Sequence, residues 1–239
     1  MERNIKSLIN YSVAATDGII GEVPEFYFDD QSYKIRYLIV KTGSWLSERK
    51  VLISPDAILK QPWKNSLFSV NLTKKQIKNS PDIDTDKPVS RQQEIELYGH
   101  YQWESYWGSG FYGGGAMGMG TGMPYPVVDQ KVLTETDKKD KHIDDDIHLR
   151  STETITGYHI HASDGEIGHV KDFIIDDQTW QVMFIVVDTT NWFGGKKVLI
   201  PISHIKKIEW TDNLVYLNVS KAAVDHSPLF EEADYLQMQ

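Results

Sequence analysis

The sequence predicts a mainly β fold in which two small, similar β-barrels, each followed by a short helix, are joined by a long connecting segment. The first observation is a duplication. Residues 11–81 align without a gap to residues 158–228, with 26 identities over 71 positions. The second is that both copies consist of short β-type runs separated by turn signals. A repeat of this length indicates two domains and not a solenoid.

The turns and strands of each copy can be read in order. Asp17-Gly18 and Asp164-Gly165 stand between short extended runs, and Asp-Gly is a strong hairpin signal because glycine accepts the positive φ of such turns. Apolar runs rich in β-branched and aromatic residues follow over 22–30 and 35–42, and over 169–177 and 182–189. Pro24 within one of these strands predicts an edge or a bulge.

Further strands are expected from the repeated "KVLI" and from "LFSVNL" and its partner "LVYLNV". Five or six short strands in about 70 residues favour closure into a small barrel, which removes exposed edges. The repeated turn and core positions are predicted to define this fold and to carry no chemistry. They include Asp17, Gly18, Gly21, Asp164, Gly165 and Gly168.

Helices are expected after each barrel and at the start of the connecting segment. Thr73 and Ser220 are candidate N-caps of the two terminal helices, and Ser90 with Gln93 forms a capping-box pattern. The segment "YWGSGFYGGGAMGMGTGMPYP" is of low complexity and reads as a linker or an adhesive strip. We therefore expect a first barrel over 1–84, a linker over 85–148 and a second barrel over 149–239.

Composition narrows the functional classes. The net charge of −9 argues against nucleic-acid binding, which needs a basic face. The lack of cysteine excludes disulfides and thiolate metal sites, and no apolar run is long enough for a membrane-spanning helix. These features predict a cytoplasmic protein without an integral span, although contact with a membrane surface remains open. We identify no catalytic motif and expect neither an enzyme nor a cofactor.

Two loops offer candidate binding residues. Trp45 and Trp192 recur before the "KVLI" strand, where an aromatic side chain can plug the barrel end or anchor a partner. In the second copy Lys196 and Lys197 follow two glycines and form a small cationic turn that could hold an anion. Each has a plainer interpretation as part of the barrel end or of a surface loop.

A histidine pair is the weak candidate for a metal site. His159 and His161 are two residues apart, so on a strand they share one face. With a two-residue turn at 164–165, His169 lies opposite Ile160 and points to the other face, which leaves the pair without an obvious third ligand. Exposed histidines are the plainer interpretation.

The two copies together resemble the PRC-barrel family. The resemblance rests on the "DG..IG.V.D..ID" opening, the apolar strand, the "KVLIP...I" strand and the terminal "LT..Q...SP" helix. The second copy matches through Asp164, Gly165, Gly168, Val170, Asp176 and Pro201, whereas the first has Ser54 at the last of these positions. The family includes the cytoplasmic domain of the photosynthetic reaction-centre H subunit and the barrel of a ribosome-maturation factor.

The resemblance implies a fold more than an activity. Our leading hypothesis is a non-enzymatic binding or scaffold protein that contacts itself, as a homo-oligomer, and an unknown protein partner. One alternative is an accessory role in electron transport, as the likeness to the H subunit implies. Another is a metal-binding protein that uses His159 and His161.

Overall fold

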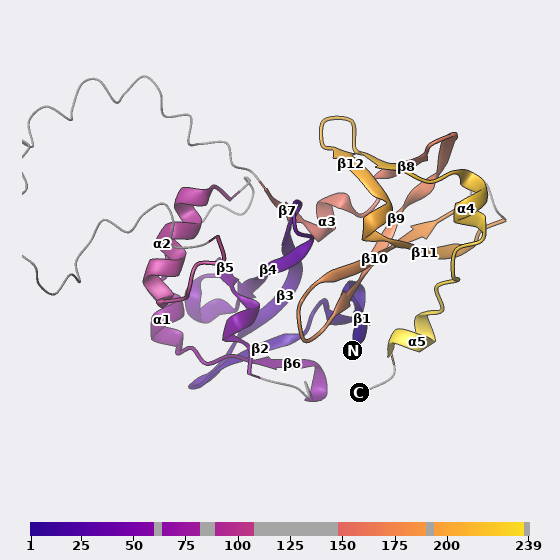
Figure 1. Cartoon of the computed structure of the whole chain (residues 1–239). Helices are drawn as coiled ribbons and strands as arrows, with labels where there is room; N and C mark the ends of the chain where they lie inside the picture. The colour runs from indigo at the N-terminus through magenta and orange to yellow at the C-terminus, as the bar shows by residue number, and fades with distance from the viewer. Residues whose placement is uncertain (60–63, 82–88, 108–147, 190–193, 237–239) are drawn as a thin grey trace, which may run out of the picture.

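The computed structural model describes residues 1–59, 64–81, 89–107, 148–189 and 194–236. Figure 1 shows two β-rich halves side by side, with the N-terminal half in indigo to magenta and the C-terminal half in orange to yellow. We call residues 11–81 copy one and residues 158–228 copy two. The mainly β fold predicted from the sequence is confirmed, since strand residues outnumber helical residues in both halves.

The first sheet has the strand order β5-β4-β3-β2-β6, and β7 pairs with β3 outside this path. Its pairs are antiparallel except for β2 with β6. The strands are β2 (Ser12–Ala15), β3 (Gly18–Asp29), β4 (Lys34–Thr42), β5 (Lys50–Ile53), β6 (Leu67–Ser69) and β7 (Leu149–Ser151).

The second sheet repeats this plan with the order β11-β10-β9-β8-β13-β12, and β1 pairs with β9 outside the path. No ladder joins the two ends of either sheet within the described ranges, so each copy is a partly open barrel. The strands are β1 (Glu2–Asn4), β8 (His159–Ala162), β9 (Gly165–Asp176), β10 (Val182–Asp188), β11 (Lys197–Pro201), β12 (Ile205–Glu209) and β13 (Leu214–Leu217).

Short helices lie at the predicted places. Thr73 and Ser220 cap the two terminal helices, and Ser90 with Gln93 closes a capping box. The helices are α1 (Lys74–Lys78), α2 (Arg91–Tyr101), α3 (Thr152–Ile155), α4 (Lys221–Asp225) and α5 (Glu232–Leu236). The 3-10 turns are η1 (Ile5–Leu8), η2 (Ser44–Leu46), η3 (Pro55–Ala57), η4 (Lys64–Ser66) and η6 (Ile202–His204).

The two halves exchange their N-terminal strands. β1, which precedes copy one, pairs antiparallel with β9 of copy two, and β7, which precedes copy two, pairs antiparallel with β3 of copy one. The offset that aligns the two copies also places β1 on β7, so the exchange is reciprocal. Figure 1 shows β1 beside the C-terminal half and β7 beside the N-terminal half.

Matching ion pairs hold the two exchanged strands. Arg3 Nε donates to Asp177 Oδ2 at 2.7 Å, and the equivalent Arg150 Nε donates to Asp30 Oδ2 at 2.9 Å. The ammonium group of Met1 also pairs with Asp177 Oδ1 at 2.9 Å. Since Asp177 is buried, its charge is held by these two cations.

A buried carboxylate receives the end of each exchanged strand. Asn4 Nδ2 donates to Asp172 Oδ2 at 2.9 Å, and the backbone N–H of Lys6 donates to Asp172 Oδ1 at 3.2 Å. At the equivalent place in the first sheet, Ser151 Oγ donates to Glu25 Oε2. Burial raises the pKa of Asp172, although the hydrogen bonds from Asn4 and from the Phe173 and Lys6 backbone act in the opposite direction.

A pseudo-two-fold axis passes between the β3–β4 and β9–β10 turns. Lys34 forms an isolated antiparallel bridge with Gln181, and these two residues occupy equivalent positions in the alignment of the two copies. The hydrogen bonds around it are paired as well: Ile35 N donates to Trp180 O and Val182 N to Tyr33 O, both at 2.8 Å. Such a self-complementary contact is what a symmetric dimer uses, here made within one chain.

One hydrophobic core runs through both halves. Trp180, from copy two, lies with its ring centroid 6.2 Å from those of Phe26 and Phe68 in copy one. Phe28 and Phe173 meet across the same boundary at 5.9 Å. The two halves therefore pack against each other through a shared core and are not independent domains joined only by a linker.

Candidate functional site

The repeated turn residues fix each terminal helix onto its barrel. Asp17 Oδ1 accepts a hydrogen bond from the backbone N–H of Lys74 at 2.8 Å, and Asp164 Oδ1 accepts one from Lys221 at the same distance. Gly18 and Gly165 have φ angles of +126° and +131°, which only glycine adopts without strain. The two aspartates and the two glycines therefore have a structural role in the hairpin turns and in positioning the helix that follows each barrel.

The second repeated glycine allows two strands to approach closely. A Cβ on Gly21 would overlap the carbonyl oxygen of Lys41, and a Cβ on Gly168 would overlap that of Asp188. Gly168 also has a φ of +148°. The repetition of Gly21 and Gly168 thus follows from backbone packing.

Trp45 lies on η2 at one end of the first barrel, half-buried against the core. Its indole Nε1 donates to the carbonyl of Ile20 at 2.7 Å, and Lys74 Nζ lies 5.4 Å from its ring centroid. Its equivalent Trp192 lies outside the described residues. The surroundings of Trp45 combine a packed side chain with a partly exposed edge.

The two candidate lysines do not share one site. Lys196 is exposed and its Nζ lies 3.4 Å from Asp225 Oδ1. Lys197 begins β11 as the partner of Asp188 in the ladder and is half-buried. The cationic turn thus consists of one surface ion pair and one strand residue.

The expected position of His169 is wrong. It pairs with His159 and not with Ile160, because Ala162 pairs with Gly165 and the two-residue turn is therefore Ser163-Asp164, one residue earlier than expected. A bulge between Ile160 and His161 then shifts the register of the β8–β9 ladder by one residue. His159 Nδ1 lies 2.9 Å from Glu166 Oε1 on the surface, and His161 contacts the Tyr216 ring. No group of three or more potential ligands placed to hold a metal ion is found within the part of the chain that the structure describes.

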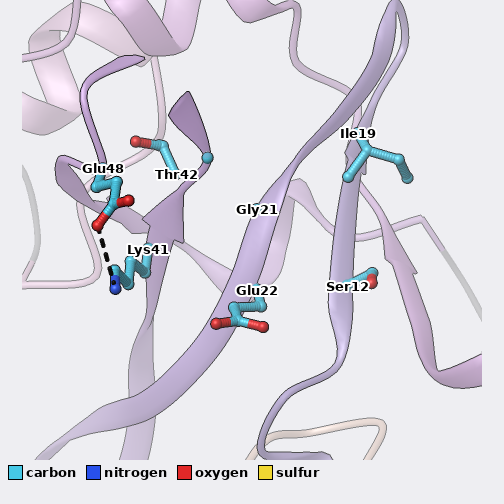
Figure 2. Close-up of a pocket in the computed structure, with 8 residues that line it drawn as sticks. Ser12, Ile19, Gly21, Glu22, Lys41, Thr42 and Glu48 are labelled. Atoms are coloured by element: carbon cyan, nitrogen blue, oxygen red, sulfur yellow. Dashed lines mark ion pairs between the residues drawn. The ribbon is translucent and has the colours of Figure 1, made fainter. Parts of the chain in front are cut away.

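The bulge predicted at Pro24 is present, since the β3–β4 register shifts between Glu22 and Glu25. Beside this irregularity, copy one has a surface hollow of about 350 Å³ between β2, β3 and the end of β4. Figure 2 shows the residues that line it, with Lys41 and Glu48 joined by an ion pair of 3.4 Å on one side. Ile19 stands on the opposite side and is 54% exposed.

The hollow differs from the equivalent region of copy two. Where copy one has Ile19 and Ser12, copy two has Glu166 and His159, whose Oε1 and Nδ1 atoms lie 2.9 Å apart on the surface. Gly43 also lines the hollow, and a Cβ at that position would lie 3.7 Å from the Trp45 ring. Copy one therefore presents an exposed apolar side chain and a half-buried tryptophan at the end of the barrel.

A buried polar network lies between α2 and the first sheet. Glu94 is fully buried, and its Oε1 accepts hydrogen bonds from the hydroxyls of Tyr37 at 2.7 Å and Tyr106 at 2.8 Å. Its Oε2 lies 2.9 Å from Arg91 Nη1, an ion pair whose geometry is not that of an aligned hydrogen bond. Arg91 Nη2 donates to His148 Nε2 at 2.8 Å, so that nitrogen is the unprotonated one.

This network changes the acidity of its tyrosines. Burial and the charge of Glu94 raise the pKa of Tyr37 and of Tyr106 well above the usual value. Burial raises the pKa of Tyr98 to about 12. Tyr106 and His148 lie on the two sides of the segment 108–147. Tyr106 bonds directly to the buried Glu94 carboxylate, and His148 is linked to it through Arg91.

The network was missed in the sequence, although a signal is present. Arg91, Glu94 and Tyr98 have the spacing i, i+3, i+7, which places them on one face of α2. An ionised side chain on a face that also carries Leu97 and Tyr101 indicates a helix that buries a charge. The partners on other elements, Tyr37 and His148, cannot be read from local spacing.

No helix among the described residues is long and apolar enough to cross a membrane. No curated protein matches the chain in a sequence search. The model of the PRC-barrel domain matches residues 1–77 and 155–223, which together are more than half of the sequence. Both matched segments contain the turn glycines described above, and the chain belongs to the PRC-barrel domain family.

Proposed function

We propose that this chain is a non-enzymatic binding or scaffold protein whose ligand is a protein surface, a second copy of the chain included. The carrying observation is the contrast between the two copies at the barrel end. Copy one exposes Ile19 beside a hollow of about 350 Å³, and copy two has the charged Glu166 at the same place.

The physical reason is the cost of leaving apolar surface in water. A large exposed aliphatic side chain next to a hollow gains free energy when a partner covers it, at roughly 25 cal/mol per Å². Trp45 lies beside the same hollow, and tryptophan is enriched among residues that dominate binding energy. The repeated residues, by contrast, are used in turns, glycine contacts and the strand exchange.

The experiment compares two single substitutions. Ile19→Glu gives copy one the residue that copy two carries at the equivalent position, so the barrel should remain folded. Met183→Ser, at another large exposed apolar side chain on β10, is the matched control. Untagged wild-type protein and both variants, purified gently from their own cells, are compared by native mass spectrometry.

Wild type and Met183→Ser should retain a protein partner or an oligomer that Ile19→Glu loses, with unchanged thermal stability. A wild-type protein found only as a bare monomer, also after chemical cross-linking in cells, would contradict the proposal. Equal retention by Ile19→Glu and Met183→Ser would contradict the assignment of the contact to this end of copy one.

A further inference from the structure

A second cavity lies at the junction of the two copies, near the pseudo-two-fold axis. It has a volume of about 170 Å³ and is lined by the start of β4, by η3, by Tyr98 of α2 and by residues 178–180 of copy two. A water molecule occupies about 30 Å³ of the liquid, so the cavity has room for a ligand the size of several waters. Its walls come from both copies, so it exists only because the halves are packed together.

Two cations line this cavity. Lys34 is half-buried, and no acceptor for its Nζ is found among the residues that the structure describes. Arg36 uses its Nη2 to reach Asp29 Oδ2 at 3.4 Å and Ser32 Oγ at 3.3 Å, and its guanidinium lies 3.6 Å from the Tyr106 ring centroid.

The Nε of Arg36 is buried and has no acceptor within the described ranges. A buried donor without an acceptor loses its hydration and gains nothing in return, which is costly enough that native structures seldom keep one. The Arg36 guanidinium therefore keeps a positive charge that its protein neighbours satisfy only in part. Because Lys34 lines the same cavity, an anion placed there would be attracted by both cations.

Neutral donors and one acid complete the cavity wall. Ser54 is buried, and its Oγ accepts a hydrogen bond from Asp56 N, so its own proton is available to a ligand. Gln178 adds an exposed side-chain amide. Asp56 also lines the cavity and opposes an anion, so it limits the affinity.

The repeat shows that the fold does not require these cations. Copy two has Gln181 where copy one has Lys34, and Met183 where copy one has Arg36. Both pairs of positions lie at equivalent places, on β4 or at the start of β10. The barrel of copy two thus forms without a basic pair at these positions, whereas copy one places both cations at the cavity.

We propose that this junction cavity binds a small oxyanion, with Lys34 and Arg36 as its cationic ligands and Ser54 as a hydrogen-bond donor. This site is separate from the hollow beside Ile19, and Ile19→Glu leaves it unchanged. The experiment is therefore independent of the proposed protein-binding function. Inorganic phosphate and acetate are the two probes, with sodium chloride at equal ionic strength as the reference.

The titration follows the ¹⁵N-indole signal of Trp180, which lines the cavity and is identified by its loss in Trp180→Phe. Lys34→Gln copies the residue of copy two and should weaken binding about tenfold, which equals about 1.4 kcal/mol. Asp56→Asn removes the opposing charge and should tighten binding severalfold. Lys206→Gln removes an exposed cation on β12 and should leave the affinity unchanged.

Opposite effects of Lys34→Gln and Asp56→Asn cannot both arise from damage to the fold. A saturable shift for either probe with this pattern supports the site, and the preferred probe tells phosphate from carboxylate. The proposal is overturned if neither probe shifts the Trp180 signal more than chloride does. It is overturned as well if Lys34→Gln and Lys206→Gln bind alike.

Discussion

Removing the arginine that pins the N-terminal strand should destabilise the whole molecule. In Arg3→Ala the buried carboxylate of Asp177, with 3% of its side chain exposed, loses a donor at 2.7 Å. At an effective dielectric constant near 20, the Coulomb attraction at this distance is about 6 kcal/mol, and desolvation of both charges offsets much of it.

Losing one partner of a fully buried pair costs about 3–5 kcal/mol. Asp177 keeps the ammonium group of Met1 at 2.9 Å, which is itself half exposed, so we expect a smaller loss of about 2 kcal/mol for Arg3→Ala. For a chain of this size the melting temperature should fall by roughly 4–8 °C. The matched control is Arg150→Ala, whose pair with Asp30 is more exposed, and we expect about 1 kcal/mol there.

The assay is urea denaturation at neutral pH, monitored by tryptophan fluorescence and by far-ultraviolet circular dichroism. Both probes should report one transition, because a single core joins the halves. Arg3→Ala combined with Asp177→Asn should recover part of the loss, since no buried charge is left unpaired. An unchanged midpoint in Arg3→Ala, or separate transitions for the two halves, would refute the reasoning.

Three further changes test other parts of the structure. Gly168→Ala should lower the free energy of unfolding by more than about 3 kcal/mol, because the new Cβ would overlap backbone atoms at a residue with positive φ. At Gly99 on α2 a new Cβ meets no atom, so Gly99→Ala should stabilise the protein by about 0.5–1 kcal/mol. Thermal melts of the two variants test this difference. Burial raises the pKa of the Asp172 carboxyl in the folded state, so its contribution to stability is fully present below the pKa of the unfolded state and is lost as pH rises through the pKa of the folded state. Asp172→Asn should remove this pH-dependent loss, which urea denaturation at a series of pH values from acid to neutral measures. Glu94→Gln should cost about 3 kcal/mol in urea denaturation, because Arg91 then faces a neutral amide; an unchanged midpoint would show that the network adds no net stability.

Local signals account for much of the fold. Asp-Gly turns, the caps at Thr73, Ser90 and Ser220 and the bulge at Pro24 act over a few residues, so they can be read directly from the sequence. The bulge beside His161 could not, because an extra residue in a ladder depends on how two strands pack. The position of the turn at Ser163-Asp164 and this bulge together place His169 opposite His159.

The strand exchange lies beyond local reasoning. β1 and β7 contain three residues each, too few for a periodic pattern, and their partners are far away along the chain. One signal was available: Arg3 and Arg150 are equivalent under the alignment, just outside its ungapped core, and so are Asp30 and Asp177. The buried network at Glu94 and the cavity at Lys34 likewise depend on residues from separate elements.

The strand exchange also sets an order of events during synthesis. β1 leaves the ribosome first, yet its place in the β9 ladder exists only after copy two has emerged. At about 5–20 residues per second, this interval is on the order of 10–30 s. During that time the nascent first barrel lacks β7 as well, so the edge of β3 at Tyr27–Asp29 stays uncovered until copy two arrives. Slow translation of the connecting segment would lengthen the time for which the β3 edge is exposed. A chaperone that binds exposed sheet edges would bind the nascent chain during this time.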